Sequence, residues 1–149
     1  MAALKSMQTL RPPSPASRLL QWIAVVHTFV PATNPFYTVV ETAYNRGIIS
    51  GYTCGPSCLE FRPGNNVTRG QLSKIIVLAQ GWQLHTPPTP TFQDVPADSP
   101  FYPHIETAYA HNIISGYSCG PPCLEFRPGN NATRGQICKI VYLAVTQAQ

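Results

Sequence analysis

The sequence has little charge and no long apolar run. Only 11% of its 149 residues are charged, the formal net charge is +4, and the basic residues form no Lys/Arg cluster. These features argue against nucleic acid as a partner, and an acidic ligand would need only a local site. The longest apolar stretch, residues 19–30, is interrupted by Gln21 and His27 and is shorter than the ~18 residues of a membrane span. We therefore predict no membrane span, and no small-residue cleavage site follows this stretch to mark a signal peptide.

Proline and glycine, in contrast, are plentiful, with 16 and 10 residues. This composition is typical of short helices joined by well-defined turns, not of a coiled coil or a disordered chain. The chain is also long enough to bury a core and fold independently.

The chain repeats itself. The segment SGYTCGPSCLEFRPGNNVTRGQ at residues 50–71 returns as SGYSCGPPCLEFRPGNNATRGQ at residues 115–136. The offset of about 65 residues pairs Arg69 with Arg134. A weaker echo, LRPPSPASR, places Arg18 after Arg11 with the spacing that separates Arg69 from Arg62. The sequence therefore predicts about two and a half repeats, of which the first is only a second half.

This organisation divides the chain into four parts. They are an N-terminal half repeat with a second helix only (residues 1–30), a first repeat (31–81), a proline-rich connector (82–95) and a second repeat (96–149). We expect the connector to be extended and semi-rigid. Because a helix pair of this size cannot bury its apolar faces alone, the repeats must pack on one another.

Each full repeat is predicted to contain two helices joined by a long turn. The first helix is expected to start at residues 34–35 and 99–100, where an N-cap residue precedes a proline. It is expected to end at Gly47 and Asn112, the two residue types that best tolerate the left-handed conformation after a helix. The predicted fold class is mainly α, built from tandem helix-loop-helix repeats.

The second helix is predicted to start at a capping box, Thr-Arg-Gly-Gln. In this motif the threonine hydroxyl accepts a backbone N–H bond three residues on, and the glutamine reaches back. The helix has an apolar face at helical spacing. The face consists of Leu72, Ile75, Ile76 and Ala79 in the first repeat, and of Ile137, Ile140, Val141 and Ala144 in the second.

In combination, these motifs resemble the repeats of the S-layer homology family. The second repeat has a Phe-x-Asp-Val-Pro opening at residues 92–96, Ile-Ile-x-Gly-Tyr at 113–117, Phe-x-Pro at 126–128 and Thr-Arg-x-Gln at 133–136. The resemblance implies a noncatalytic extracellular module that holds proteins on a prokaryotic cell surface by binding cell-wall glycopolymer, which is often pyruvylated. It further implies three repeats in a pseudo-threefold helical prism, with ligand grooves between neighbouring repeats.

The family's arginine that meets the acidic sugar falls on Arg69 and Arg134, and through the weaker echo on Arg18. An arginine in the first helical turn adds a forked donor to the positive end of the helix dipole, which suits a carboxylate or phosphate. The predicted ligand-binding residues are Arg69, Arg134, Thr68, Thr133, Gln71, Gln136 and Arg18. The alternative is a structural ion pair between each arginine and Glu60, Glu125, Glu41 or Glu106.

The sequence departs from the family pattern in three ways. The segments TCGPSC and SCGPPC replace the usual Asp-Gly turn, and the first repeat has VHTFVP without the opening aspartate. Only two first helices are present, which argues against a complete three-repeat prism within one chain.

The cysteine pairs lie inside the long turns. A turn can bring residues i and i+4 within the about 4.4–6.8 Å between Cα atoms that a disulfide requires. We therefore predict two intraloop disulfides, Cys54–Cys58 and Cys119–Cys123, that lock the loops. The alternatives are a zinc site of four thiolates, which requires the two loops to meet, and free thiols. Cys138 is left over and is expected to be a small, partly buried residue.

No catalytic arrangement repeats with the chain. The four histidines have no histidine at the matching positions, and neither a Ser/His/Asp set nor a carboxylate pair recurs. We predict neither an enzyme nor a cofactor or metal. The sequons at Asn66 and Asn131 are better explained by the helix-capping role of their threonines.

Two functions remain open at this point. The first is a surface module that binds acidic cell-wall polysaccharide and anchors protein to the cell envelope. The alternative is a self-assembling extracellular subunit, in which another copy covers the apolar residues of the half repeat and the contact propagates as a filament, tube or layer. These residues are Leu20, Trp22, Ile23 and Val26.

Overall fold

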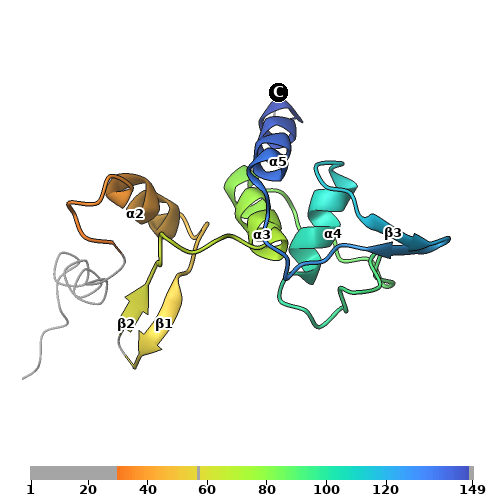
Figure 1. The fold of residues 1–149 in the computed structure, drawn as a ribbon, viewed down its shortest axis with the longest axis horizontal. Helices are drawn as coiled ribbons and strands as arrows, with labels where there is room; N and C mark the ends of the chain where they lie inside the picture. Colours follow the sequence, from red (N-terminus) through yellow and green to blue (C-terminus); the bar gives the residue numbers. More distant parts are fainter. Residues whose placement is uncertain (1–29, 57, 148–149) are drawn as a thin grey trace, which may run out of the picture.

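The computed structural model describes residues 30–56 and 58–147. The predicted half repeat, with Arg18, lies outside the described residues. The described elements are α2 (Tyr37–Asn45), β1 (Tyr52–Gly55), β2 (Cys58–Glu60), α3 (Arg69–Gln80), α4 (Tyr102–Ala110), β3 (Tyr117–Gly120), β4 (Cys123–Glu125) and α5 (Arg134–Gln147). Helix, hairpin and helix thus occur twice in the same order (Figure 1). None of the described helices combines the length and the apolarity needed to cross a membrane.

The long turn of each repeat contains an antiparallel strand pair, which the sequence prediction missed. β1 pairs with β2 and β3 with β4, and the register of each pair shifts beside the turn. The prediction of a mainly α fold is therefore only partly right. With three or four residues, each strand is too short for an alternating pattern to identify it.

Both predicted disulfides are present at these hairpins. Cys54 is bonded to Cys58 and Cys119 to Cys123, with Cα atoms 5.0 and 5.1 Å apart. Because all four thiols are used in this way, the zinc alternative is wrong. The bonds close each hairpin at its turn.

The first helix of each repeat begins later than predicted. The N–H of Phe36 donates to Asn34 Oδ1 at 2.9 Å, and that of Phe101 to Ser99 Oγ at 3.3 Å. Asn34 and Ser99 therefore cap a turn that precedes the helix, and α2 and α4 start only at residues 37 and 102. The ends agree with the prediction, since Gly47 and the matching asparagine adopt left-handed φ angles of 69° and 56°.

The second helices carry the predicted capping boxes. Thr68 Oγ1 accepts from the N–H of Gln71 at 3.3 Å, and the N–H of Thr68 donates to Gln71 Oε1 at 3.0 Å. The same two bonds join Thr133 and Gln136 at the same lengths. The threonine of each sequon is thus used as a helix cap.

The described chain has two apolar cores of unequal size. A small one around Val40 joins α2 to the first hairpin. The larger one contains residues of α3, α4 and α5, including Leu72, Ile105 and Ala144. In Figure 1, α3 lies beside α4 and α5, while α2 and the first hairpin stand apart from them. The second helix of the first repeat therefore packs into the second repeat.

This packing changes which face of α3 is buried. Ser73 and Val77 are buried, although neither was predicted for the apolar face, and Ala79 is exposed. The reason is that α3 contacts both α4 and α5, so the buried surface extends around the helix. Periodicity alone could not reveal which neighbours cover it.

The end of the connector packs against the second repeat. Phe92 is fully buried in the larger core. Thr91 donates its N–H and its hydroxyl to the carboxylate of Glu106 at 2.9 and 2.8 Å. The carboxylate of Asp94 accepts the N–H groups of Phe126 and the next residue at 2.7 and 2.6 Å. The aspartate of the Phe-x-Asp-Val-Pro motif thus fixes the loop that follows the second hairpin.

Candidate ligand-binding grooves

Each described repeat has a groove between its hairpin and its second helix. The first groove has a volume of about 370 Å³ and the second of about 220 Å³. Eight lining positions match at the repeat offset. They are Ile48, Ile49, Ser50, Gly51, Tyr52, Gln71, Lys74 and Ile75 in the first groove, and Ile113, Ile114, Ser115, Gly116, Tyr117, Gln136, Lys139 and Ile140 in the second.

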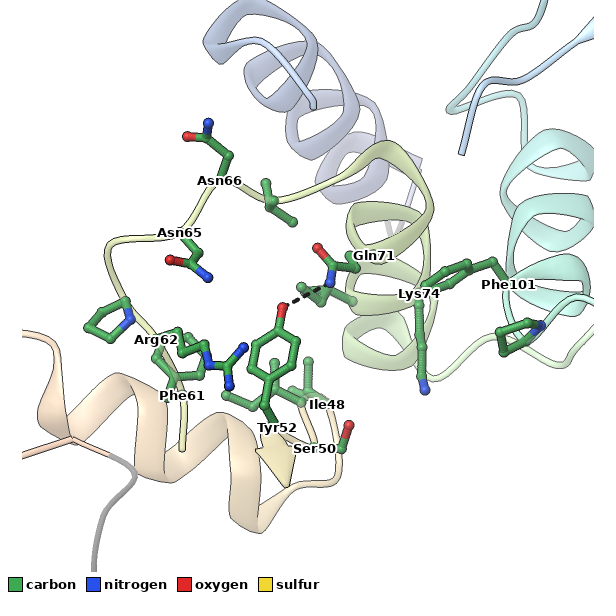
Figure 2. Close-up of a pocket in the computed structure, with 16 residues that line it drawn as sticks. Ile48, Ser50, Tyr52, Phe61, Arg62, Asn65, Asn66, Gln71, Lys74 and Phe101 are labelled. Atoms are coloured by element: carbon green, nitrogen blue, oxygen red, sulfur yellow. Dashed lines mark hydrogen bonds between the residues drawn. The ribbon is translucent and has the colours of Figure 1, made fainter. Parts of the chain in front are cut away.

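A glutamine and a tyrosine meet in each groove. Gln71 Nε2 donates to the hydroxyl of Tyr52 at 3.0 Å, and Gln136 Nε2 donates to that of Tyr117 at 3.1 Å. Figure 2 shows this bond in the first groove, with Lys74 on the same helix as the glutamine. Each glutamine thus caps its helix with one end of the amide and holds the hairpin tyrosine with the other. The Gly-Tyr and Thr-Arg-x-Gln motifs are far apart in sequence but form one site.

The arginine of each Phe-Arg-Pro segment lies on the tyrosine ring of its groove. The guanidinium of Arg62 is 4.7 Å from the ring centroid of Tyr52, and that of Arg127 is 4.6 Å from Tyr117. Arg62 forms an ion pair with Glu60, and Arg127 Nε lies 3.1 Å from Glu125 Oε2. Because these pairs are largely exposed, each is worth only about 0–1 kcal/mol. Their main consequence is that the charges of both arginines are already compensated.

Of the two predicted arginines that the structure describes, Arg69 enters a groove, and that groove belongs to the other repeat. Its side chain is buried and lines the second groove. Arg69 Nε donates to the carbonyl of Phe126 at 2.8 Å, and its guanidinium lies 4.4 Å from the Phe126 ring centroid and 4.9 Å from that of Tyr117. Arg69 therefore both joins the repeats and brings a cation to the groove.

The charge of Arg69 has no carboxylate partner at hydrogen-bond distance in the described part of the chain. Its acceptors are the neutral carbonyls of Phe126 and Ser115. Burial lowers the pKa of Arg69, while attraction to Tyr117 and Asp94 opposes this shift. An arginine stays protonated in proteins, so the second groove keeps a positive charge. Arg69 does not form the glutamate pair considered as the alternative.

The other predicted ligand residues have different environments. Arg134 is exposed at the start of α5. Thr68 and Thr133 cap their helices and do not line either groove, whereas Gln71 and Gln136 do. Arg18 lies outside the described residues. The structure thus brings Arg69 and Gln136 together in one groove and leaves Gln71 in the other.

Two pairs of groove residues were missed by the sequence interpretation. Tyr52 and Tyr117 line the grooves, as do Lys74 and Lys139. A signal was present, because both residue types are identical at the repeat offset. Among the described residues, no three His, Cys, Asp or Glu side chains gather as a metal site.

Comparisons with known proteins identify the family. Two segments, residues 30–73 and 91–138, match the S-layer homology domain and together make up more than half of the chain. An endoglucanase from Bacillus sp. (strain KSM-635) is 29% identical over 120 residues, which is 77% of this chain and 12% of the enzyme. The chain therefore spans only a small part of that relative. S-layer homology domains are binding modules that attach to cell-wall polymers at prokaryotic cell surfaces. The chain belongs to the S-layer homology domain family.

Proposed function

We propose that the chain is a noncatalytic extracellular module that anchors protein to the cell envelope by binding an acidic cell-wall glycopolymer in its two grooves. The observation that carries this proposal is the repetition of one groove with the same tyrosine, glutamine and lysine. A site that recurs with its polar side chains intact is suited to a polymer whose own units recur. We infer no catalytic activity from the similarity to an endoglucanase, because the chain spans only 12% of that enzyme.

The chemistry of the lining residues suits an acidic sugar. The isoleucines and the tyrosine ring offer apolar surface to the C–H faces of a sugar. Lys74 and Lys139 supply ammonium groups that form charge-assisted hydrogen bonds with a carboxylate. Arg69 adds a second cation to the second groove. A pyruvyl ketal or another carboxylate substituent provides the matching anion.

Two grooves on one chain also favour a polymeric ligand. Once one groove is occupied, a second unit of the same polymer is held near the other groove at a high effective concentration. The overall affinity for a long polymer then exceeds the affinity for one unit, provided that the polymer spans both sites. We therefore expect weak binding of short fragments and firm retention on intact wall.

The lysines are the residues to test, because Arg69 also holds the repeats together. The experiment measures the affinity of Lys74→Ala and Lys139→Ala for purified acidic glycopolymer from a Bacillus cell wall. We expect each single change to weaken binding about fivefold, or about 1 kcal/mol, since each removes one exposed charge-assisted contact. The double variant should weaken binding by about the product of the two single effects.

The matched control is Arg46→Ala. Arg46 is exposed at the end of α2 and outside both grooves, so its loss changes the net charge as much as one lysine substitution does, without touching a site. Mild acid treatment that removes pyruvyl groups from the polymer should weaken binding of the unmodified chain in the same way. Single lysine variants that both bind as tightly as the Arg46 control would contradict the proposal.

The alternative, in which filament formation instead of wall binding is the function of the chain, has less support. The matched family consists of wall-binding modules, which favours anchoring as the function.

A further inference from the structure

The contact between the two repeats has a defined set of residues. The N–H groups of Arg69 and Gly70 donate to the carbonyls of Asn130 and Pro128 at 2.8 and 2.9 Å. The N–H of Ala132 donates to the carbonyl of Val67 at 3.0 Å. The start of α3 is thus bonded to the loop of the next repeat through its backbone, and the rest of α3 packs on α4.

The same face recurs on α5, where most of it is exposed in the described part of the chain. The positions that α3 buries are Arg69, Gly70, Leu72, Ser73 and Val77. Four of their five counterparts, Arg134, Gly135, Cys138 and Tyr142, are exposed, while the fifth, Ile137, is partly buried against the larger core. Tyr142 is 65% exposed, whereas Val77 is 1% exposed. Val145, at 53%, extends this apolar surface by one further turn. We call this set of α5 residues the tail face.

The opposite half of the contact recurs on α2. In α4, Tyr102 and His104 are buried. Tyr102 belongs to the larger core, and its hydroxyl donates to the carbonyl of Pro87 in the connector. Their counterparts Tyr37 and Val39 are exposed, and Val39 has 64% of its surface accessible where His104 has 8%. Pro63 and Asn65, which correspond to the two loop residues that accept the bonds from α3, are exposed as well. We call this set the head face.

Glycine marks where the contact is tight. A Cβ atom on Gly70 would lie 3.0 Å from Phe101 Cδ2 and 3.2 Å from Pro128 Cβ. A Cβ atom on Gly135 would meet nothing within 4 Å. The repeat thus keeps, at an exposed position, the glycine that close approach requires.

We propose that the tail face of one copy of this chain docks on the head face of a second copy, so that the internal contact between α3 and α4 is repeated between chains. Each chain carries both complementary halves of an interface it already forms, and both halves are exposed. Among the described residues, the tail face of a second copy is therefore the surface that matches the head face most fully. Docking would also bring Arg134 to the first groove as Arg69 is brought to the second.

The contact is head to tail and needs no glycan, so it can be tested without the proposed ligand, although Pro63 and Asn65 of the head face also line the first groove. A head-to-tail contact has two different faces, and each can be blocked separately. Tyr142→Glu places a charge in the tail face, and Val39→Glu places one in the head face. Both residues are exposed in the single chain, so we expect both variants to fold, which circular dichroism will check.

The experiment is a mixing test by light scattering at high micromolar concentration. The unmodified chain should associate, and each variant alone should be monomeric. An equal mixture of the two variants should form a pair of twice the monomer mass and no larger species, because only one intact tail and one intact head remain. Leu84→Glu is the matched control, since it charges an exposed apolar residue that belongs to neither face and should leave association unchanged.

Cys138 gives a second measurement on the unmodified chain. It is exposed, so the sequence prediction of a partly buried residue was wrong, and it lies in the tail face, while its counterpart Ser73 is 0% exposed. When nine-tenths of the tail faces are covered, maleimide labelling of Cys138 should slow by roughly tenfold, because only uncovered tail faces react. A monomeric unmodified chain, a mixture that does not pair, or pairing by either variant alone would overturn the proposal. If residues 1–29 of the same chain cover the head face, the unmodified chain will be monomeric, and this result would overturn the proposal.

Discussion

Alanine at the two matching glycines should have effects of opposite sign. Gly70 and Gly135 occupy the same position in the first turn of their helices and follow identical residues. Only Gly70 packs closely against the other repeat. The pair therefore tests the packing between the repeats while helix propensity is held constant.

The magnitudes follow from the local distances. Alanine favours a helix over glycine by about 0.5–1 kcal/mol, and nothing opposes this gain at Gly135, where no atom lies within 4 Å of the added Cβ. At Gly70 the added Cβ would lie 3.0 and 3.1 Å from two ring atoms of Phe101 and 3.2 Å from Pro128. Overpacking of this kind costs about 1–3 kcal/mol, which exceeds the propensity gain. We expect Gly135→Ala to stabilise the chain by about 0.5 kcal/mol and Gly70→Ala to destabilise it by about 1 kcal/mol.

Equilibrium urea unfolding, followed by circular dichroism at low micromolar concentration, measures both free energies. Low concentration keeps the chain monomeric, so that any contact between copies does not contribute. The unmodified chain is the common reference. Equal stabilisation by both substitutions would refute the reasoning, because it would mean that the start of α3 is not tightly packed on the second repeat.

Two further predictions concern the buried polar residues at the same contact. Arg69→Ala should lower the free energy of unfolding by about 2–3 kcal/mol, because it removes a charged hydrogen bond and leaves the Phe126 carbonyl without that donor. Arg134→Ala, at an exposed site, should change the free energy of unfolding by less than about 0.5 kcal/mol. Urea unfolding of both variants measures the two effects, and equal losses would contradict the prediction. Burial lowers the pKa of His104, so the unfolded chain binds more protons below the ordinary histidine pKa of about 6.5, and stability should fall as pH drops below that value. His104→Val, which installs the residue of the first repeat, should reduce this dependence in thermal unfolding between neutral and mildly acidic pH; an unchanged profile would assign the pH dependence to other groups.

Features that depend on neighbouring residues could be predicted from the sequence. The capping boxes need only four consecutive residues, and the left-handed helix ends need only a glycine or an asparagine at the right place. The disulfides also follow from a short spacing within a turn. The family resemblance rested on the same local motifs, and the match to the S-layer homology domain confirms it.

Features that depend on packing between the repeats could not be predicted in this way. Arg69 and Arg134 stand in the same motif, yet one is buried in the next repeat and the other is exposed. Helical periodicity indicates an apolar face but not the neighbour that covers it, so Ser73 and Val77 were missed. The groove residues Tyr52 and Lys74 belong to separate segments, and only the fold brings them together.

The central claim is that both grooves bind the acidic wall polymer, and the glutamine side-chain amides are its most direct probes. Gln71 and Gln136 each hold a groove tyrosine, so their side-chain amide signals in nuclear magnetic resonance spectra should move when acidic wall oligosaccharide is added. The amide of Gln80, bonded to the Ala144 carbonyl away from the grooves, serves as the internal reference and should stay in place. Saturable shifts of both groove amides are the predicted result. No shift at either glutamine, at oligosaccharide concentrations that shift signals elsewhere in the chain, would contradict the account.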